Sequence, residues 1–224
     1  MNVTVIVPAY NEAKRIGNTI SSLKKALAIE TRIIVVDDGS QDDTAGVAAQ
    51  SGAEVFSMPQ NSGKGEALNK GLQFVETQAV AFIDADLEYT AGEAAKLIQP
   101  VLDGKADMTI ARFPKAKKKG GFGIVKGSSR WIIRHYTGLT MESPLSGQRV
   151  MTRELLKAIG NMPSGYGVEI GLTIMAAKKG FRVIEVPVNM YHNESGRSVS
   201  GFLHRGKQLW HVLLATHKSL KACR

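Results

Sequence analysis

One short stretch, from Ala79 to Leu87, limits the folds open to this chain, because an uncharged run there ends in two carboxylates. Val80 to Ile83 are β-forming residues without charge, which is typical of a strand buried on both faces of a sheet. Asp84 and Asp86 then fall at the carboxyl end of that strand, the edge where open α/β sheets bind ligands. Two acids so close together repel unless a cation neutralises them, so the pair predicts a divalent metal holding a diphosphate. The alternative is that one Asp only caps the following helix.

The chain before this stretch alternates strand and helix three times. Strands are expected over 3–7, 32–36 and 53–57, and helices with apolar residues at helical spacing follow them. Pro8 is expected to stop the first strand, and Asn11 and Glu12 to open the first helix. This alternation predicts an α/β fold with a mostly parallel, doubly wound sheet and helices on both faces. Further strands are expected over 107–111, 147–151 and 182–188, the last as an edge strand because it contains Pro187.

Composition indicates an ordinary globular protein and narrows its partners. Hydrophobic residues make up 43% and charged residues 22% of the 224, and no apolar run is long enough to span a membrane. The only cysteine, Cys223, excludes a disulfide framework, so we expect a cytoplasmic protein. The net charge of +9 favours anionic partners such as nucleotides, phosphorylated acceptors or an anionic membrane face. With 6% aromatic residues and no zinc-finger spacing, we expect no nucleic-acid partner.

Two common nucleotide-binding motifs are absent. Lys64 is followed by Gly65 instead of Ser or Thr, and Met58 stands where a kinase-type phosphate loop needs glycine. No glycine triplet follows the first strand, which excludes the dinucleotide fingerprint. What remains is a set of polar and glycine residues at the ends of consecutive strands, and together they predict a nucleotide-sugar site at one sheet edge: Tyr10, Asn11, Glu12, Asp37, Asp38, Gly63, Lys64, Gly65, Asp84 and Asp86.

Four segments of the first half, 5–12, 35–40, 61–65 and 84–87, together resemble the family 2 glycosyltransferases. The resemblance implies a GT-A fold and a transferase that inverts the anomeric centre. It also implies that Pro8, Tyr10 and Glu12 line the nucleoside, that Asp38 binds the base, and that Lys64 closes this pocket. Asp84 would lie near the sugar or ribose, and Asp86 would ligate Mg²⁺ or Mn²⁺ on the diphosphate, since hard oxygen ligands suit these cations.

The second half resembles two narrower groups. Residues 144–147 and 165–171 are similar to glucosyl-3-phosphoglycerate synthases, which implies that His192 is a second metal ligand. Gly196, Arg197 and Ser198 are similar to the Gly-x-Ser of polyprenyl-phosphate (dolichyl-phosphate) sugar synthases. The Gly-Arg-x-Thr element of the phosphoglycerate enzymes has no match at 121–124, which favours the polyprenyl phosphate acceptor.

The acceptor decides which groups the reaction needs. A phosphate oxygen is already anionic and needs only positioning, for which the candidates are Lys117, Tyr166, Arg197 and Arg205. A hydroxyl acceptor would need a carboxylate base within hydrogen-bond reach, and Glu169 is then the candidate.

Residues 1–198 are expected to form the catalytic domain, with a nucleotide-sugar half (1–111) and an acceptor half (112–198). Residues 199–224 predict a basic amphipathic helix that packs on its own domain, on a sister subunit of a homodimer, or on the inner face of a membrane. The predicted activity is therefore a metal-dependent transfer from a UDP- or GDP-linked sugar to a phosphorylated acceptor. The alternatives are transfer to phosphoglycerate, a sugar-phosphate nucleotidyltransferase, and a non-catalytic nucleotide-sugar-binding protein.

Overall fold

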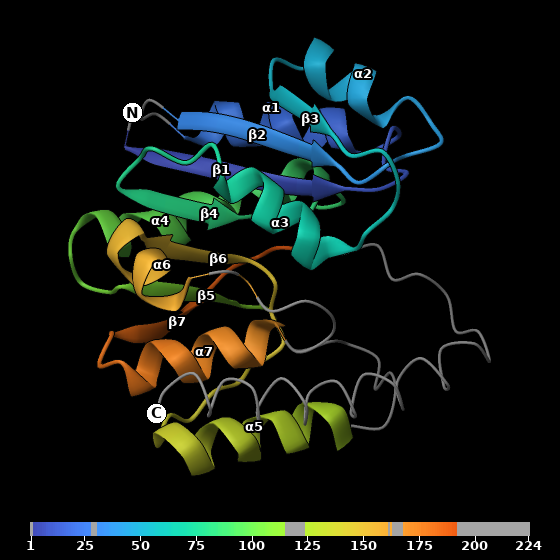
Figure 1. Cartoon of the computed structure of the whole chain (residues 1–224). Helices are drawn as coiled ribbons and strands as arrows, with labels where there is room; N and C mark the ends of the chain where they lie inside the picture. Colours follow the sequence, from blue (N-terminus) through green and yellow to red (C-terminus); the bar gives the residue numbers. More distant parts are fainter. Residues whose placement is uncertain (1, 28–30, 115–123, 161, 163–167, 192–224) are drawn as a thin grey trace.

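A seven-stranded sheet organises the part of the chain that the structure describes (Figure 1). The computed structural model describes residues 2–27, 31–114, 124–160, 162 and 168–191. The strand order is β3-β2-β1-β4-β6-β5-β7, so β4, the strand that leads to Asp84, lies at its centre. The strands are β1 (Val3–Ala9), β2 (Thr31–Asp37), β3 (Glu54–Ser57), β4 (Ala79–Phe82), β5 (Met108–Arg112), β6 (Arg149–Thr152) and β7 (Val183–Pro187).

All strand pairs are parallel except those of β6, which runs antiparallel to both β4 and β5. The predicted mostly parallel sheet is thereby confirmed, and β7 is an edge strand as its proline indicates. Because β1, β2 and β4 are parallel neighbours, their carboxyl ends meet at one edge of the sheet. The loops that follow these three strands, together with the loop from β3 into α3, build the site described below.

Helices cover both faces of the sheet, as a doubly wound fold requires (Figure 1). One apolar core lies under α1, α2 and α4, and the other lies under α3, α6 and α7, with α5 packed on α7. The helices are α1 (Ile16–Ala26), α2 (Thr44–Gln50), α3 (Lys64–Leu72), the short 3₁₀ helix η1 (Glu88–Glu93), α4 (Ala94–Leu102), α5 (Ile124–Thr137), α6 (Arg153–Ile159) and α7 (Val168–Lys178).

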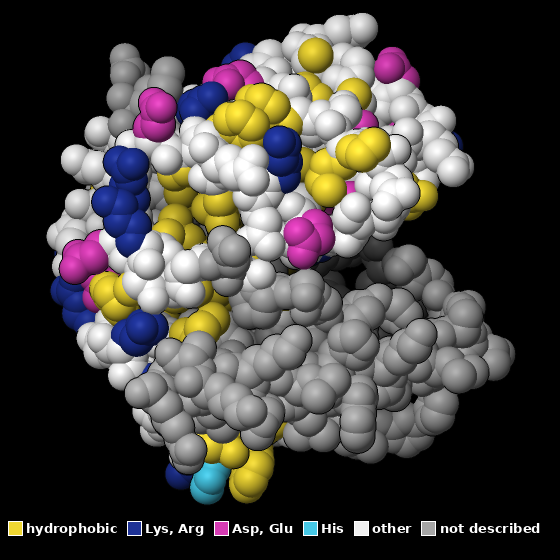
Figure 2. Space-filling model, in the orientation of Figure 1, with side chains coloured by type: hydrophobic (Ala, Val, Ile, Leu, Met, Phe, Trp, Pro, Cys, Tyr) yellow, Lys and Arg dark blue, Asp and Glu magenta, His cyan; other side chains and the backbone are white. Residues whose placement is uncertain are grey.

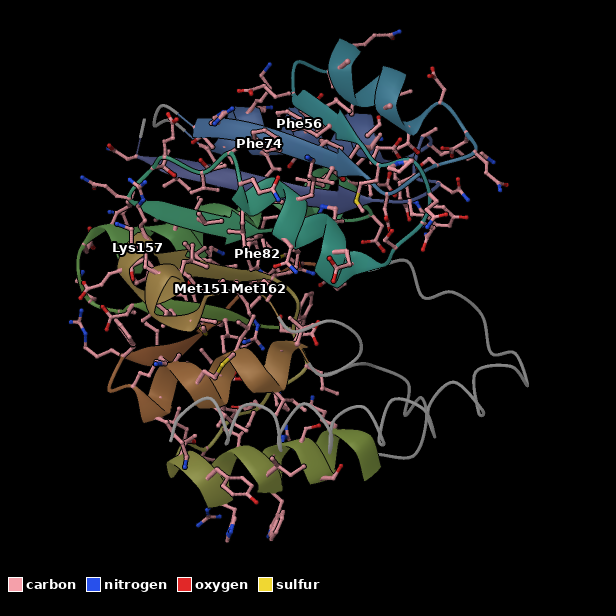
Figure 3. The ribbon with its side chains drawn as sticks, viewed as in Figure 1. Phe56, Phe74, Phe82, Met151, Lys157 and Met162 are labelled. Atoms are coloured by element: carbon pink, nitrogen blue, oxygen red, sulfur yellow. The ribbon has the colours of Figure 1, made fainter. Side chains whose placement is uncertain are left out.

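Side chains of β4 and β6 fix the centre of the second core. Phe82 and Met151 are buried on the same face of the sheet and meet Met162 there (Figure 3). Phe56 and Phe74 stack at the rim of this core with ring centroids 3.8 Å apart. This packing holds the end of β4 rigidly, so the carboxylates that follow β4 start from a fixed point.

Most strand ends differ from the prediction by one or two residues, and two boundaries differ for a clear physical reason. Pro8 lies inside β1 and does not end it. Proline has no N–H, but at this position the N–H would face β4, and β4 has already ended there. The last hydrogen bond between these two strands joins the carbonyl of Ile6 to the N–H of Ile83. The first helix begins at Ile16, since Asn11 takes a left-handed backbone conformation (φ 56°) that interrupts a helix. The predicted helix over 199–224 lies outside the described residues.

In the described part of the chain, no helix is long and apolar enough to cross a membrane. On the face shown in Figure 2, Lys and Arg side chains lie interspersed with Asp and Glu. By sequence, ten of the 29 Lys and Arg residues lie in 115–123 and 192–224, with only one of the 20 Asp and Glu residues. The excess positive charge therefore belongs to these two segments and not to the sheet and its helices.

Candidate functional site: a strand-end cavity

A cavity of about 300 Å³ opens at the carboxyl ends of β1, β2 and β4, beside the start of α3. Its volume is at the lower end of those that hold small ligands. The structure brings the residues expected to bind the nucleotide sugar (Pro8, Tyr10, Glu12, Asp38, Lys64 and Asp84), together with Asp86, to this one cavity, whereas Asn11, Asp37 and Gly65 do not line it. Its lining consists of Pro8, Ala9, Tyr10, Glu12, Asp38, Asn61, Gly63, Lys64, Ala67, Asp84, Ala85 and Asp86.

Asp38 forms one wall of the cavity by holding a neighbouring loop. Its buried carboxylate accepts the backbone N–H groups of Ser62 and Gly63, both at 2.8 Å. Gly39 follows with φ 71°, and a Cβ there would lie 2.6 Å from the carbonyl carbon of Gln60. Only glycine allows the two loops to approach so closely. The role of Asp38 in binding a base stays a prediction, but its role in shaping the wall is visible.

The loop after β1 is tied to the loop after β2. The side-chain oxygen of Asn11 accepts the N–H of Gln41 at 2.8 Å, and the N–H of Asn11 donates to Ser40 Oγ at 2.9 Å. Next along the chain, the N–H of Glu12 donates to Thr44 Oγ1 at 2.8 Å. These bonds present the ring of Tyr10 at the cavity mouth, 41% exposed, where a flat base could stack on it.

Asp84 is held from two sides. Lys64 Nζ lies 2.5 Å from its Oδ1, and Gln148 Nε2 donates to its Oδ2 at 2.7 Å. Burial lowers the pKa of Lys64, but the charges of Asp84 and Glu169 outweigh burial and raise it above its usual value. Lys64 is therefore a cation at neutral pH and neutralises Asp84 in part.

Acidic groups crowd the part of the cavity around Asp86. Burial raises the pKa of Glu12; Arg15, whose Nε lies 2.7 Å from Glu12 Oε2, opposes the rise, and the charge of Asp86 adds to it. This local excess of negative charge, together with hard oxygen donors, fits a divalent cation. No three His, Cys, Asp or Glu residues meet as a metal cluster within the described ranges, so Asp86 is the candidate ligand there, and His192 lies outside them.

Glu169 stands at the start of α7, half-buried, and does not line the cavity. Its charge nevertheless reaches the site, since it raises the pKa of Lys64. It also acts on Arg149: burial lowers the pKa of this arginine to about 10, against the opposing charges of Glu169 and Glu185. The predicted acceptor residues Lys117, Tyr166, Arg197 and Arg205 lie outside the described residues.

Sequence reasoning missed Gln148 and Arg149, which adjoin the predicted site. Both are fully buried, and Gln148 contacts Asp84 directly. Their neighbours at 144–147 carried a family resemblance, which was the one available signal. The contact with Asp84 depends on the antiparallel pairing of β4 with β6, which the alternation of strands and helices did not reveal.

Comparison with known proteins decides the family. The model of glycosyl transferase family 2 matches residues 4–158, more than half of the chain. The chain belongs to this family. Membership of this family confirms the predicted glycosyltransferase activity class. The alternative of a sugar-phosphate nucleotidyltransferase is therefore excluded.

Among curated relatives, glycosyltransferase AglJ of Haloferax volcanii is 29% identical in an alignment 199 residues long, which covers 87% of this chain and 64% of AglJ. Glucosyl-3-phosphoglycerate synthase of Mycolicibacterium smegmatis is 31% identical in an alignment 192 residues long, which covers 77% of this chain and 63% of the synthase. The chain thus spans less than two thirds of these two relatives. A crystal structure of glucosyl-3-phosphoglycerate synthase from Mycobacterium tuberculosis, in complex with Mn²⁺, UDP and phosphoglyceric acid, is similar with a TM-score of 0.80. The two sequences are 29% identical, and the alignment covers 99% of this chain and 78% of the synthase chain. The predicted GT-A fold is confirmed.

Proposed function

We propose that this glycosyltransferase moves a sugar, with inversion, from a UDP-linked donor to a phosphorylated acceptor. The observation that carries the proposal is the single cavity in which Tyr10 and Asp38 lie beside Asp84 and Asp86. This cavity combines an aromatic surface on which a base can stack with a carboxylate that can bind a metal ion. A nucleotide diphosphate with its metal ion needs both. A second structure of the same synthase was solved with Mn²⁺, UDP-glucose and phosphoglyceric acid, which favours uridine over guanosine in the donor.

Asp86 would hold Mg²⁺ or Mn²⁺, with His192 as a second ligand. Similar synthase structures contain Mn²⁺ or Mg²⁺, which supports either cation. A bound cation would act as a Lewis acid toward the departing diphosphate. The chain's own part is to bind and orient: Tyr10 stacks the base, and Asp84 accepts hydrogen bonds from sugar or ribose hydroxyls.

The charge distribution supports an anionic acceptor, because the segments that hold Lys117, Arg197 and Arg205 carry the excess positive charge of the chain. These residues and Tyr166 would place the acceptor oxygen in line with the anomeric carbon. Polyprenyl phosphate is our first candidate, with the enzyme at the inner face of the membrane. Phosphoglycerate is the second, favoured by the synthase structure solved with phosphoglyceric acid. Glu169 would serve as base only for a hydroxyl acceptor.

A thermal-shift panel with UDP, GDP, UDP-glucose and GDP-mannose, each with Mn²⁺, Mg²⁺ or EDTA, tests the donor. A ligand at one hundred times its Kd should stabilise the protein by roughly 2.7 kcal/mol. We expect a metal-dependent shift with the uridine compounds, followed by transfer to one acceptor of a polyprenyl phosphate and phosphoglycerate screen. The absence of any shift would overturn the proposal.

Asp86→Ala should lower turnover by about 10³-fold, because a metal contributes several kcal/mol and each 1.36 kcal/mol is a factor of ten. Its melting temperature should change little, since Asp86 lines an open cavity. Asp103→Ala, which removes a surface carboxylate paired with Lys105, is the matched control and should retain activity.

His192→Ala should weaken the apparent metal affinity. Wild-type turnover in Asp86→Ala, or an unchanged metal titration in His192→Ala, would remove the respective residue from the metal site.

A further inference from the structure

The side-chain amide of Gln148 forms two hydrogen bonds to the same residue, Asp84. Its Nε2 donates to Asp84 Oδ2 at 2.7 Å, and its Oε1 accepts the backbone N–H of Asp84 at 3.1 Å. Gln148 is fully buried, whereas the Asp84 side chain is 24% exposed toward the cavity. A planar carboxamide bonded to both the main chain and the side chain of Asp84 leaves that carboxylate one orientation.

Gly147 has no side chain, and this leaves room for the Lys64 ammonium group to contact Asp84 Oδ1. A Cβ at Gly147 would lie 2.5 Å from Lys64 Nζ and 3.6 Å from both carboxylate oxygens of Asp84. With only backbone there, Lys64 can reach Oδ1 while Gln148 keeps Oδ2. The two oxygens thus have different donors from different parts of the chain, α3 and the turn that precedes β6.

Arg149 anchors the turn that carries Gln148. Its guanidinium is fully buried and donates to the carbonyl oxygens of Ser146 at 2.9 Å and Pro144 at 3.3 Å. The same guanidinium donates to Thr173 Oγ1 of α7 at 2.9 Å. The turn is therefore fixed from inside by a planar fork that lysine could not reproduce.

We propose that Gln148 is a positioning residue of the transfer reaction, which holds the Asp84 carboxylate toward the donor while Arg149 holds Gln148. The proposal rests on the proposed function, since it gives Asp84 its task at the donor. At metal sites, removal of a group that orients a ligand from behind typically costs ten- to a hundredfold in affinity or activity, and we expect a loss of this order for Gln148. Gln148 does not line the cavity, so it acts through Asp84 and not by touching the donor.

The first test measures the contact itself and needs no substrate. Hydrogen exchange of the Asp84 amide, followed by NMR, should be about tenfold faster in Gln148→Met, which has similar length but cannot bond. Gln148→Glu keeps an oxygen acceptor for this amide but places a second carboxylate against that of Asp84, so its exchange rate should fall between those of the wild type and Gln148→Met. Other amides of β4 should keep their rates in both variants. An unchanged Asp84 amide in Gln148→Met would overturn the proposal.

The second test is a double-mutant cycle with UDP-glucose and Mn²⁺ as the probe, measured by titration calorimetry. Gln148→Met should weaken binding about tenfold or more in the wild-type background, and less than threefold when Asp84→Asn is already present. Equal losses in both backgrounds would mean that Gln148 acts on stability alone, and would overturn the positioning role. If wild-type protein binds no nucleotide sugar, the proposed function fails, and the amide exchange still decides whether Gln148 positions Asp84.

Thr4→Val is the matched control for both tests. The buried hydroxyl of Thr4 bonds to Thr77 Oγ1 at 2.9 Å, at the end of β1 opposite the cavity. Its loss should lower stability without changing probe affinity or Asp84 exchange. An affinity loss in Thr4→Val like that in Gln148→Met would assign both effects to stability and overturn the proposal.

Discussion

Two loops of this protein are held by the same device in very different surroundings. Asp38 accepts two backbone N–H groups from residues 62 and 63, and Glu185 accepts two from residues 142 and 143, all between 2.6 and 2.8 Å. Asp38 is 3% exposed and forms the cavity wall, whereas Glu185 is half-buried on the edge strand β7. The hydrogen bonds are alike, and the difference lies in the access of water to the two carboxylates.

This difference teaches that the number of hydrogen bonds does not set their worth. Hydrogen bonds to a carboxylate that water cannot reach are stronger, because no water competes for its oxygens, whereas a carboxylate near solvent can exchange these bonds for bonds to water. The loop at Asp38 should therefore depend on its carboxylate far more than the loop at Glu185. The loop that lines the cavity would then be the more sensitive of the two.

Asp38→Ala should have the largest effect on stability. It leaves the N–H groups of Ser62 and Gly63 without their acceptor, which should lower the free energy of unfolding by roughly 2–4 kcal/mol. Urea denaturation measures this loss. Asp38→Asn, which retains one oxygen acceptor, should recover about half of it, and a loss below about 1 kcal/mol in Asp38→Ala would contradict the argument from burial.

Glu185→Ala should have a smaller effect, about 1 kcal/mol, because water can replace the carboxylate at residues 142 and 143. The same urea measurement compares it directly with Asp38→Ala. Donor affinity should change little, since Arg149 continues to hold the turn at 144–146 from inside. A loss as large as that of Asp38→Ala would break the comparison and make bond number, not burial, the deciding quantity.

Sequence reasoning reached the first of these loops because its contacts follow from local pattern. Each strand of the parallel half ends in a polar turn, and parallel neighbours bring such turns together without further information. Tyr10, Asp38, Lys64 and Asp84 could thus be assigned to one sheet edge from the amino-acid sequence alone. Only fine boundaries were wrong, as at Pro8, where strand ending depends on how far the neighbouring strand continues.

The second loop was beyond sequence reasoning for a physical reason. Glu185 meets its partners across 42 and 43 positions, and Gln148 meets Asp84 across 64. Both contacts follow from the insertion of the antiparallel strand β6 between β4 and β5, and helix or strand periodicity does not encode strand order. A buried arginine such as Arg149 is equally hidden, because arginine is mostly exposed and its burial depends on packing from elements distant in sequence.

A third carboxylate, that of Glu54 in the parallel half of the sheet, is more exposed to solvent and should show the smallest loss of stability of the three. Glu54 accepts two hydrogen bonds at 2.7 Å from Arg32, and these bonds hold the pKa of Glu54 below its usual value of 4.5. Since its side chain is 50% exposed, solvent screens the pair, and Glu54→Gln should lower the free energy of unfolding by only roughly 0.5 kcal/mol at pH 7.

A carboxyl group with a depressed pKa in the folded state stabilises the protein above its unfolded pKa, and this stability is lost as pH falls through the folded pKa. The difference between wild type and Glu54→Gln should therefore be constant above about pH 5.5 and vanish below the folded pKa. Urea denaturation at pH 7 and pH 3, repeated in 1 M salt, measures both dependences. A loss at pH 7 comparable to that of Asp38→Ala would show that exposure does not weaken these bonds, and burial could then no longer explain why the two loops differ.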